Sequence, residues 1–140
     1  MKPKRLLLLS ALLITVAGLG IYLYVFVFAA KHRTAAEVPG IPVRADSLVM
    51  AFEADEVSAN SRYLKQVLHV TGVVLELGTN QQGQQTLMLG RADDFAHVYV
   101  TMERMLNTAV GDTVTVKGFC NGFLSDVVLT SGVPADRPMD

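Results

Sequence analysis

The stretch that most constrains the fold is Leu6 to Ala30, which contains 25 residues and no formal charge. As a helix it would be about 37 Å long, whereas the hydrocarbon core of a bilayer is about 30 Å thick. Its polar side chains, apart from two tyrosine hydroxyls, belong to Ser10 and Thr15, which can bond back to their own helix. The segment is therefore predicted to be a single transmembrane anchor, with Tyr22 and Tyr24 toward one end as interfacial residues.

A cleavable signal peptide is the alternative interpretation of the N-terminus. Residues 2–5 contain three basic side chains, and Phe-Ala-Ala at 28–30 resembles a weak cleavage site. The apolar run, however, is about twice the ~7 to 15 residues usual for a signal peptide, which favours an uncleaved signal anchor. Only two lysines or arginines follow, at 31–33, so the positive-inside rule places the N-terminus in the cytoplasm. The remainder is then predicted to be a periplasmic domain held at a bacterial inner membrane.

Charge is separated along the chain, although the formal net charge is only −1. All 13 acidic residues lie from Glu37 onward, and residues 35–140 carry seven basic and 13 acidic side chains, a net charge of −6. A domain that holds a phosphate backbone usually concentrates Lys and Arg on one face, which makes nucleic acid an improbable partner. The partners predicted instead are the membrane and an envelope protein or a small solute.

The sequence divides into five parts: a basic N-terminal tail at 1–5, the transmembrane anchor at 6–30, a linker at 31–45, a folded domain at 46–133 and a polar tail at 134–140. The linker contains Pro39, Gly40 and Pro42 and has no apolar period. Asp46 is a candidate N-cap for a helix predicted over 46–65. The apolar face of that helix would be formed by Leu48, Phe52, Ala59 and Tyr63.

From Val67 onward the apolar pattern alternates, and its parity switches after Gly72, as at a β-bulge or sharp bend. This pattern predicts a long, bent first strand that serves two halves of a sheet. A hairpin loop at 78–83, four more strands at 85–89, 96–101, 113–117 and 124–130, and a short helix at 102–108 follow. Five short strands with one helical insertion between the third and fourth predict a mainly β fold, the five-stranded Greek-key barrel called the OB-fold, with an N-terminal packing helix.

The connection between the fourth and fifth predicted strands is the candidate ligand loop, because OB-folds commonly hold ligands with that loop. Its candidate residues are Lys117, Phe119, Asn121 and Phe123. Phe119 shares the parity of outward-facing residues, which directs it away from the barrel core, toward the packing helix or a ligand.

No catalytic, cofactor or metal site is predicted. The dense carboxylates Glu53, Asp55 and Glu56 lack the spacing of a calcium loop and are interpreted as a solvated helix face. The three histidines lack a metal-ligand spacing, and the lone cysteine, Cys120, can form no disulfide within the chain. The domain is thus expected to be a non-catalytic binding module, with two alternatives: a cytoplasmic single-stranded oligonucleotide-binding domain, and an enzyme using the acidic helix.

Two stretches also carry a family resemblance. The run AFEADEVSANSRYLKQVLHVTGVV, followed by GDTVTVKGFCNGFLSDVVL, resembles the bacterial tRNA-anticodon-like OB-fold family over roughly residues 46 to 133. That family consists mostly of small membrane-attached or exported proteins of unknown function. The resemblance implies the OB-fold and supplies no catalytic residues.

Overall fold

A computed structural model describes residues 3–29, 35 and 38–135 of the chain. The chain forms two compact units, Met1–Arg33 and Thr34–Asp140. The predicted tails at 1–5 and 134–140 and the predicted linker at 31–45 lie partly outside the described residues.

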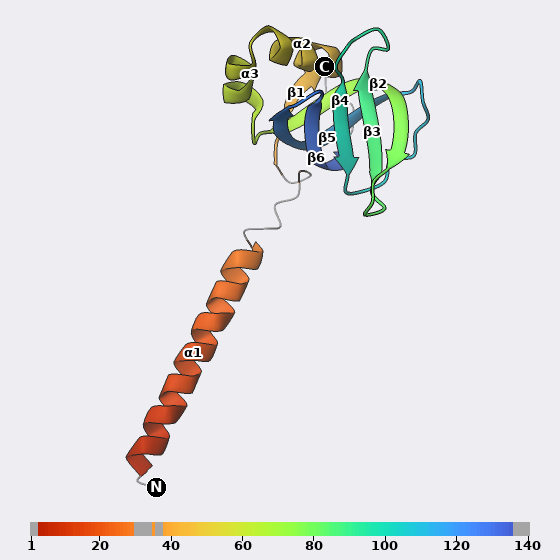
Figure 1. The fold of residues 1–140 in the computed structure, drawn as a ribbon. Helices are drawn as coiled ribbons and strands as arrows, with labels where there is room; N and C mark the ends of the chain where they lie inside the picture. The colour runs from red at the N-terminus through yellow and green to blue at the C-terminus, as the bar shows by residue number, and fades with distance from the viewer. Residues whose placement is uncertain (1–2, 30–34, 36–37, 136–140) are drawn as a thin grey trace. The chain divides into compact units, whose positions relative to one another are not determined.

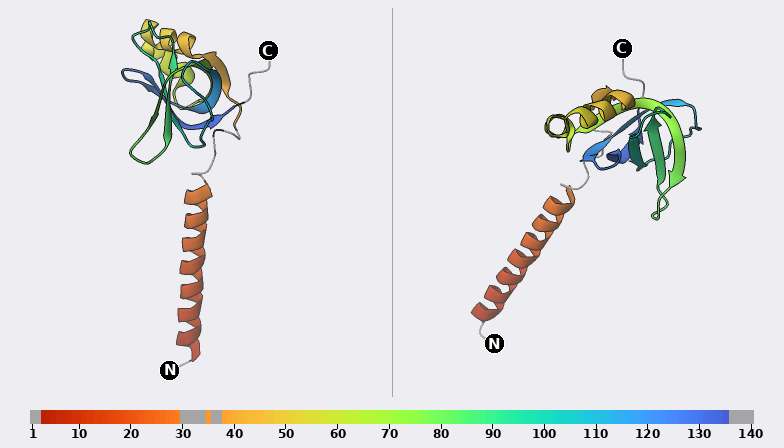
Figure 2. Two further views of the ribbon diagram at one scale, coloured as in Figure 1. Left: turned by 90° about the vertical axis from the view of Figure 1, so that its right-hand side faces the viewer. Right: turned by 45° about the horizontal axis from the view of Figure 1, so that its top comes forward.

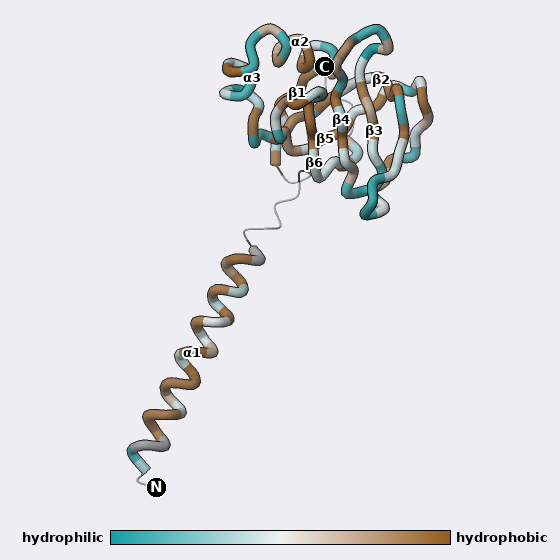
Figure 3. Tube along the Cα trace, viewed as in Figure 1, coloured by the Kyte–Doolittle hydropathy of each residue, from teal (hydrophilic) through white to brown (hydrophobic). Residues whose placement is uncertain are grey.

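The first unit contains one helix, α1 (Pro3–Ala29). Its stretch Leu7–Val27 is long and apolar enough to cross a membrane, and none of it is buried against the rest of the chain. The Ser10 hydroxyl donates to the Leu7 carbonyl, and the Thr15 hydroxyl donates within the same helix, so neither needs an outside partner. Figure 3 shows the apolar colour repeatedly along α1 beyond its hydrophilic N-terminal turn. A helix that is apolar all round is stable where its surroundings are apolar as well.

The second unit is a closed five-stranded barrel (Figure 1). Its strands run in the order β2-β3-β4-β6-β5, and β5 pairs again with β2 to close the barrel. β4 and β6 are parallel, whereas the other pairs within the barrel are antiparallel. The strands are β2 (Val67–Thr79), β3 (Gln85–Gly90), β4 (Val98–Met102), β5 (Thr113–Phe123) and β6 (Val127–Pro134). This is the strand order of the predicted OB-fold.

Strand β2 pairs with two other strands of the barrel, one along each half, as its pattern predicted. Residues Val67–Val73 pair with β5, and Val73–Thr79 pair with β3, with a register shift between Val74 and Glu76. The long yellow-green strand arches around the barrel in the right-hand view of Figure 2. Gly72 lies where the partners change, and a Cβ there would come within 2.8 Å of the Ala45 Cβ. Because glycine has no side chain, Ala45 can pack closely against β2 at this position.

The predicted helix over 46–65 is two helices, α2 (Ala45–Ala54) and α3 (Glu56–Tyr63). Asp55 separates them with an extended backbone, φ −158° and ψ 95°, and its side chain caps α3. Asp46 is not the N-cap of α2, because Arg44 holds that position and Asp46 lies in the first turn. The helices pack Phe52 and Leu48 into the barrel core, both almost fully buried. Val98 and Val100, in the strand predicted at 96–101, are fully buried in the same core.

The predicted linker contains a strand, β1 (Ile41–Arg44), which pairs in parallel with Leu68–Thr71 of β2. Ala35 is also buried, so the folded unit includes residues before the predicted boundary at 46. The physical reason is the free edge of β2, since β3 pairs only with the second half of that strand. Backbone groups on the first half of β2 therefore find their partners in the preceding segment.

The short helix predicted over 102–108 is absent, and the chain there is irregular. Met102 ends β4. The Gln85 side chain donates from Nε2 to the Leu106 carbonyl at 2.9 Å and accepts the Leu106 N–H at Oε1 at 2.8 Å. These bonds replace the backbone pairing that a helix would have supplied.

Candidate functional site

The predicted ligand loop is not a loop, because β5 continues unbroken through Phe123. Two glycines that sequence reasoning assigned to a turn lie within the strand. Gly118 faces the Thr130 carbonyl so closely that a Cβ would lie 3.1 Å from that oxygen, and Gly122 has φ +104° beside a register shift. A bulge at a positive-φ glycine bends a strand without ending it.

The four candidate residues do not form one surface. Phe123 packs inward on Phe52, whereas Phe119 packs on a separate small cluster that contains Ala35 and Val133. Phe119 thus points away from the main core, as predicted, but the segment before β1 covers it instead of the packing helices.

The polar members of the predicted set lie on the strand itself. Asn121 is exposed and donates from Nδ2 to the Thr130 hydroxyl at 3.0 Å. Lys117 is half-buried and lies between His69 of β2 and Val133 of β6 in the strand register. A ligand role for Lys117, Phe119, Asn121 and Phe123 stays a prediction.

A pocket of about 200 Å³ lies elsewhere, at the point where β2 changes partners. β1 leaves β2 after Thr71, and β3 pairs from Val73, so Gly72 forms part of the pocket between them. Arg44, the last residue of β1, lines one side, and Arg91, which follows β3, lines the pocket as well. Strand pairing on β2 therefore brings together two arginines that are far apart in the sequence.

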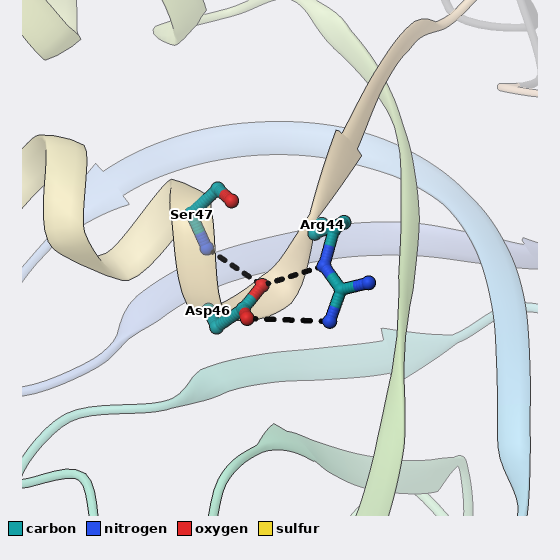
Figure 4. A network of polar contacts seen from close by, with 3 residues as sticks. All are labelled: Arg44, Asp46 and Ser47. Atoms are coloured by element: carbon teal, nitrogen blue, oxygen red, sulfur yellow. Dashed lines mark hydrogen bonds and ion pairs between the residues drawn. The ribbon is translucent and has the colours of Figure 1, made fainter.

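Both arginines belong to the same tripeptide, Arg-Ala-Asp, at 44–46 and at 91–93. Figure 4 shows the first: Arg44 donates from Nε to Asp46 Oδ1 at 3.1 Å and from Nη2 to Oδ2 at 3.3 Å. Arg91 donates to Asp93 through the same two nitrogens, at 3.3 and 3.0 Å. The two segments thus hold their guanidinium groups in the same side-on geometry.

These ion pairs determine the charge states of Asp46 and Asp93. The Arg44 side chain, by hydrogen bonding, lowers the pKa of Asp46, which also accepts the Ser47 N–H at 2.9 Å. The pKa of Asp93 is lowered by its own backbone N–H and then by Arg91. Both carboxylates are ionised at neutral pH. The charged lining residues are Arg44, Asp46 and Arg91; together with Asp93, which pairs with Arg91, they carry no net charge.

This pocket was missed at the level of sequence. The available signal was the repeated tripeptide, placed each time after a short apolar run, at 41–44 and at 85–90. The alternation of apolar and polar residues does not reveal this repeat, because Arg44 lies in the segment that was predicted to be a linker. Arg91, the second arginine of the pocket, lies in a polar connection, and that connection gave no reason to search for a site.

Other reactive side chains do not form a second site within the described part of the chain. No group of three or more His, Cys, Asp or Glu side chains there could hold a metal ion. Cys120 is fully buried, and burial raises the pKa of its thiol. His69 keeps its Nε2 buried without a hydrogen-bond partner.

The chain combines an N-terminal helix that is apolar enough to span a membrane with a closed OB barrel. These two parts place it in the class of small OB-fold proteins with an apolar N-terminal segment. The tRNA_anti-like family matches residues 1–131, and this chain belongs to that family. The match includes α1 as well as the barrel, which is more than the 46–133 predicted from sequence.

A solved structure supports the fold. The chain resembles a crystal structure from Klebsiella pneumoniae, described as a "putative nucleic acid-binding lipoprotein", with a TM-score of 0.51 and 12% sequence identity. The likeness covers 67% of this chain and 92% of the other. At that identity it establishes the shared fold. No curated protein sequence matches this chain.

Proposed function

We propose that this chain is a membrane-anchored, non-catalytic OB-fold binding module whose barrel faces the periplasm, with its N-terminus in the cytoplasm. The observation that carries the proposal is the apolar stretch Leu7–Val27, exposed along its whole length and joined to an independently folded barrel. A helix of this length and composition has the bilayer as its natural surroundings.

The orientation rests on charge. Three lysines or arginines precede the apolar run and two follow it, and the side with more of them is retained in the cytoplasm. The net charge of −6 on residues 35–140 suits a domain that stays off an anionic lipid surface and away from nucleic acid. An inner-membrane protein with a single pass and a periplasmic barrel is consistent with both.

Nucleic-acid binding is the second candidate function. The similar Klebsiella structure is described in those terms, and Phe95, fully exposed in the β3–β4 connection, offers one ring for base stacking. This function requires the barrel in the cytoplasm and an attraction to phosphate that overcomes the acidic domain charge. We therefore place it second.

Labelling of single cysteines in intact cells tests the proposal. Ser125→Cys places a thiol in the exposed β5–β6 turn, and Lys4→Cys places one at the start of α1, while native Cys120 is buried. In a Gram-negative host with a permeabilised outer membrane, an impermeant maleimide should label Ser125→Cys and leave Lys4→Cys unlabelled until lysis. The reverse pattern would overturn the orientation and move single-stranded oligonucleotide binding to first place.

A further inference from the structure

We propose that the pocket between the two Arg-Ala-Asp segments, 44–46 and 91–93, binds the phosphate group of a small ligand. This inference rests on the proposed function of the barrel as a binding module and names the chemistry of its ligand. The pocket is lined by Arg44 and Arg91, and the charge of Arg91 interacts with that of Asp46, the ion-pair partner of Arg44.

The first step of the argument is convergence. Arg44 ends β1, which pairs with β2 as far as Thr71, and Arg91 follows β3, whose pairing with β2 begins at Val73. The two arginines therefore reach the pocket from strands on the same side of β2, with Gly72 between them. Gly72 adds no side chain of its own, and the Ala45 Cβ packs closely over it, so the floor of the pocket between the two arginines is formed by small residues.

The second step concerns the hydrogen bonds that remain. In both ion pairs the aspartate accepts from Nε and Nη2, the side edge of the guanidinium. Among the described residues, the bonds of both guanidinium groups use Nε and Nη2, so the two N–H groups of each Nη1 have no partner there. Arginine donors in a fixed fork bind oxyanions well, and a tetrahedral phosphate can accept from two such forks at once.

The third step is rigidity. Each aspartate fixes its arginine two residues away, and Asp46 is itself fixed by the Ser47 N–H at the start of α2. A side chain already held in place loses less conformational entropy when a ligand arrives. Ala45 and Asp46, at the N-terminus of α2, also line the pocket. The positive end of the helix dipole therefore adds to the electrostatic attraction of an anion there.

The fourth step is size and charge. A volume of about 200 Å³ accommodates a phosphate group together with part of the molecule that carries it. The two arginines and their ion-pair partners Asp46 and Asp93 are together neutral, whereas residues 35–140 carry −6. A compact phosphate interacts mainly with the wall, while an extended polyanion would also meet the acidic surface around it. The pocket therefore favours a small phosphate compound or a lipid headgroup over nucleic acid.

The test uses the full chain in maltoside micelles, where orientation in a membrane has no influence. Sodium phosphate is titrated at pH 7.5 and constant ionic strength set with sodium chloride, and the melting temperature is recorded. A ligand that binds the folded state raises the melting temperature saturably. We expect saturable stabilisation by phosphate and a markedly weaker effect of acetate. Equal stabilisation by acetate would overturn the assignment to phosphate.

Variants then locate the binding. Arg44→Gln and Arg91→Gln should each weaken phosphate binding about tenfold, and the double variant should abolish it. Arg104→Gln, which removes the same charge from an exposed position in the β4–β5 connection, should bind like the wild type. The proposal is wrong if the wild type shows no phosphate-specific stabilisation, or if Arg104→Gln weakens binding as much as the pocket variants do. Circular dichroism of each variant confirms that it is folded.

The source of the phosphate is resolved by repeating the titration in nanodiscs of phosphatidylcholine and of phosphatidylglycerol. If a lipid headgroup occupies the pocket, the apparent affinity for inorganic phosphate falls in phosphatidylglycerol relative to micelles. If the ligand is a soluble phosphate compound, the affinity stays the same. Both outcomes support the phosphate site. Failure of the cysteine-labelling experiment would leave these results unchanged, so the two proposals fail independently.

Discussion

The ring of Phe123, the last residue of β5, stacks on the ring of Phe52 in α2, with ring centroids 5.8 Å apart and ring planes 18° apart. This contact joins the helices to the barrel. Phe52→Ala should therefore lower the free energy of unfolding by about 3 to 5 kcal/mol, because it removes a buried ring and leaves a cavity. Urea unfolding of the full chain in micelles measures the loss. Phe95→Ala removes a fully exposed ring and is the control, which should change the free energy of unfolding little. A loss as large as that of Phe52→Ala would contradict the stabilising role of the buried Phe52 ring.

Gly72 is predicted to tolerate no side chain. An added Cβ would lie 2.8 Å from the Ala45 Cβ and 3.2 Å from the Leu89 Cβ, so Gly72→Ala should destabilise the barrel by about 1 to 3 kcal/mol. The same measurement on Gly72→Ala combined with Ala45→Gly should recover part of the loss, since the nearer contact is then removed. Strict additivity of the two changes would show that the two residues do not interact.

Asp55 is predicted to stabilise α3 through its cap in a pH-dependent way. The Ser58 hydroxyl donates to Asp55 Oδ2 at 2.6 Å, and this bond, followed by the one from the Ser58 N–H, lowers the pKa of Asp55 below its ordinary 3.8. A folded-state pKa below the unfolded one means that the stabilisation is complete above the unfolded value and disappears as the pH falls through the folded value.

Asp55→Ala should lower the melting temperature by roughly 5 °C at neutral pH. The difference from the wild type should shrink as the pH falls below the ordinary pKa of 3.8 and through the lower folded-state pKa, where the carboxylate becomes protonated. Asp55→Asn is the matched control, because asparagine caps helices comparably and does not titrate. A difference between wild type and Asp55→Ala that is independent of pH would exclude the charged cap.

Cys120 is predicted to be unreactive in the folded protein. Its side chain is fully buried, and burial raises the pKa of the thiol, so the reactive thiolate is scarce. Alkylation by iodoacetamide should be about a hundredfold or more slower in the native chain than in the chain unfolded in guanidinium. Ser125→Cys, at an exposed position, reports the rate of an accessible thiol in the same sample. Equal rates at the two cysteines would show that β5 opens readily.

Residue patterns predicted those parts of the fold in which local pattern and packing agree. The uncharged run before Ala30 predicted α1, and the alternation around Gly72 predicted that β2 would serve two halves of the barrel. Val98 and Val100 alternate along β4, and both enter the core, whereas in β5 Thr115 is buried beside Val116. In each case one short stretch contains the whole signal.

The remaining features depend on partners distant in the sequence. β1 forms because β2 has a free edge, and the connection at 103–110 is irregular because the Gln85 side chain binds Leu106. Gly118 and Gly122 have the composition of a turn, yet pairing of Gly118 with Leu68 of β2 and of Gly122 with Val128 of β6 keeps both inside β5. The pocket required two arginines from separate strands, and this juxtaposition exists only once β2 has paired.

The proline within β1 has a consequence for crowding. β1 is four residues long and lies at the edge of the sheet. Pro42, its second residue, has no backbone N–H to donate. Proteins tethered in one membrane plane meet their neighbours far more often than free ones do. A margin that cannot supply an unbroken row of donors gives an adjacent barrel no template for strand addition. Under the membrane anchoring proposed above, Pro42 therefore makes this sheet margin a poor template for the sheet of a neighbouring copy.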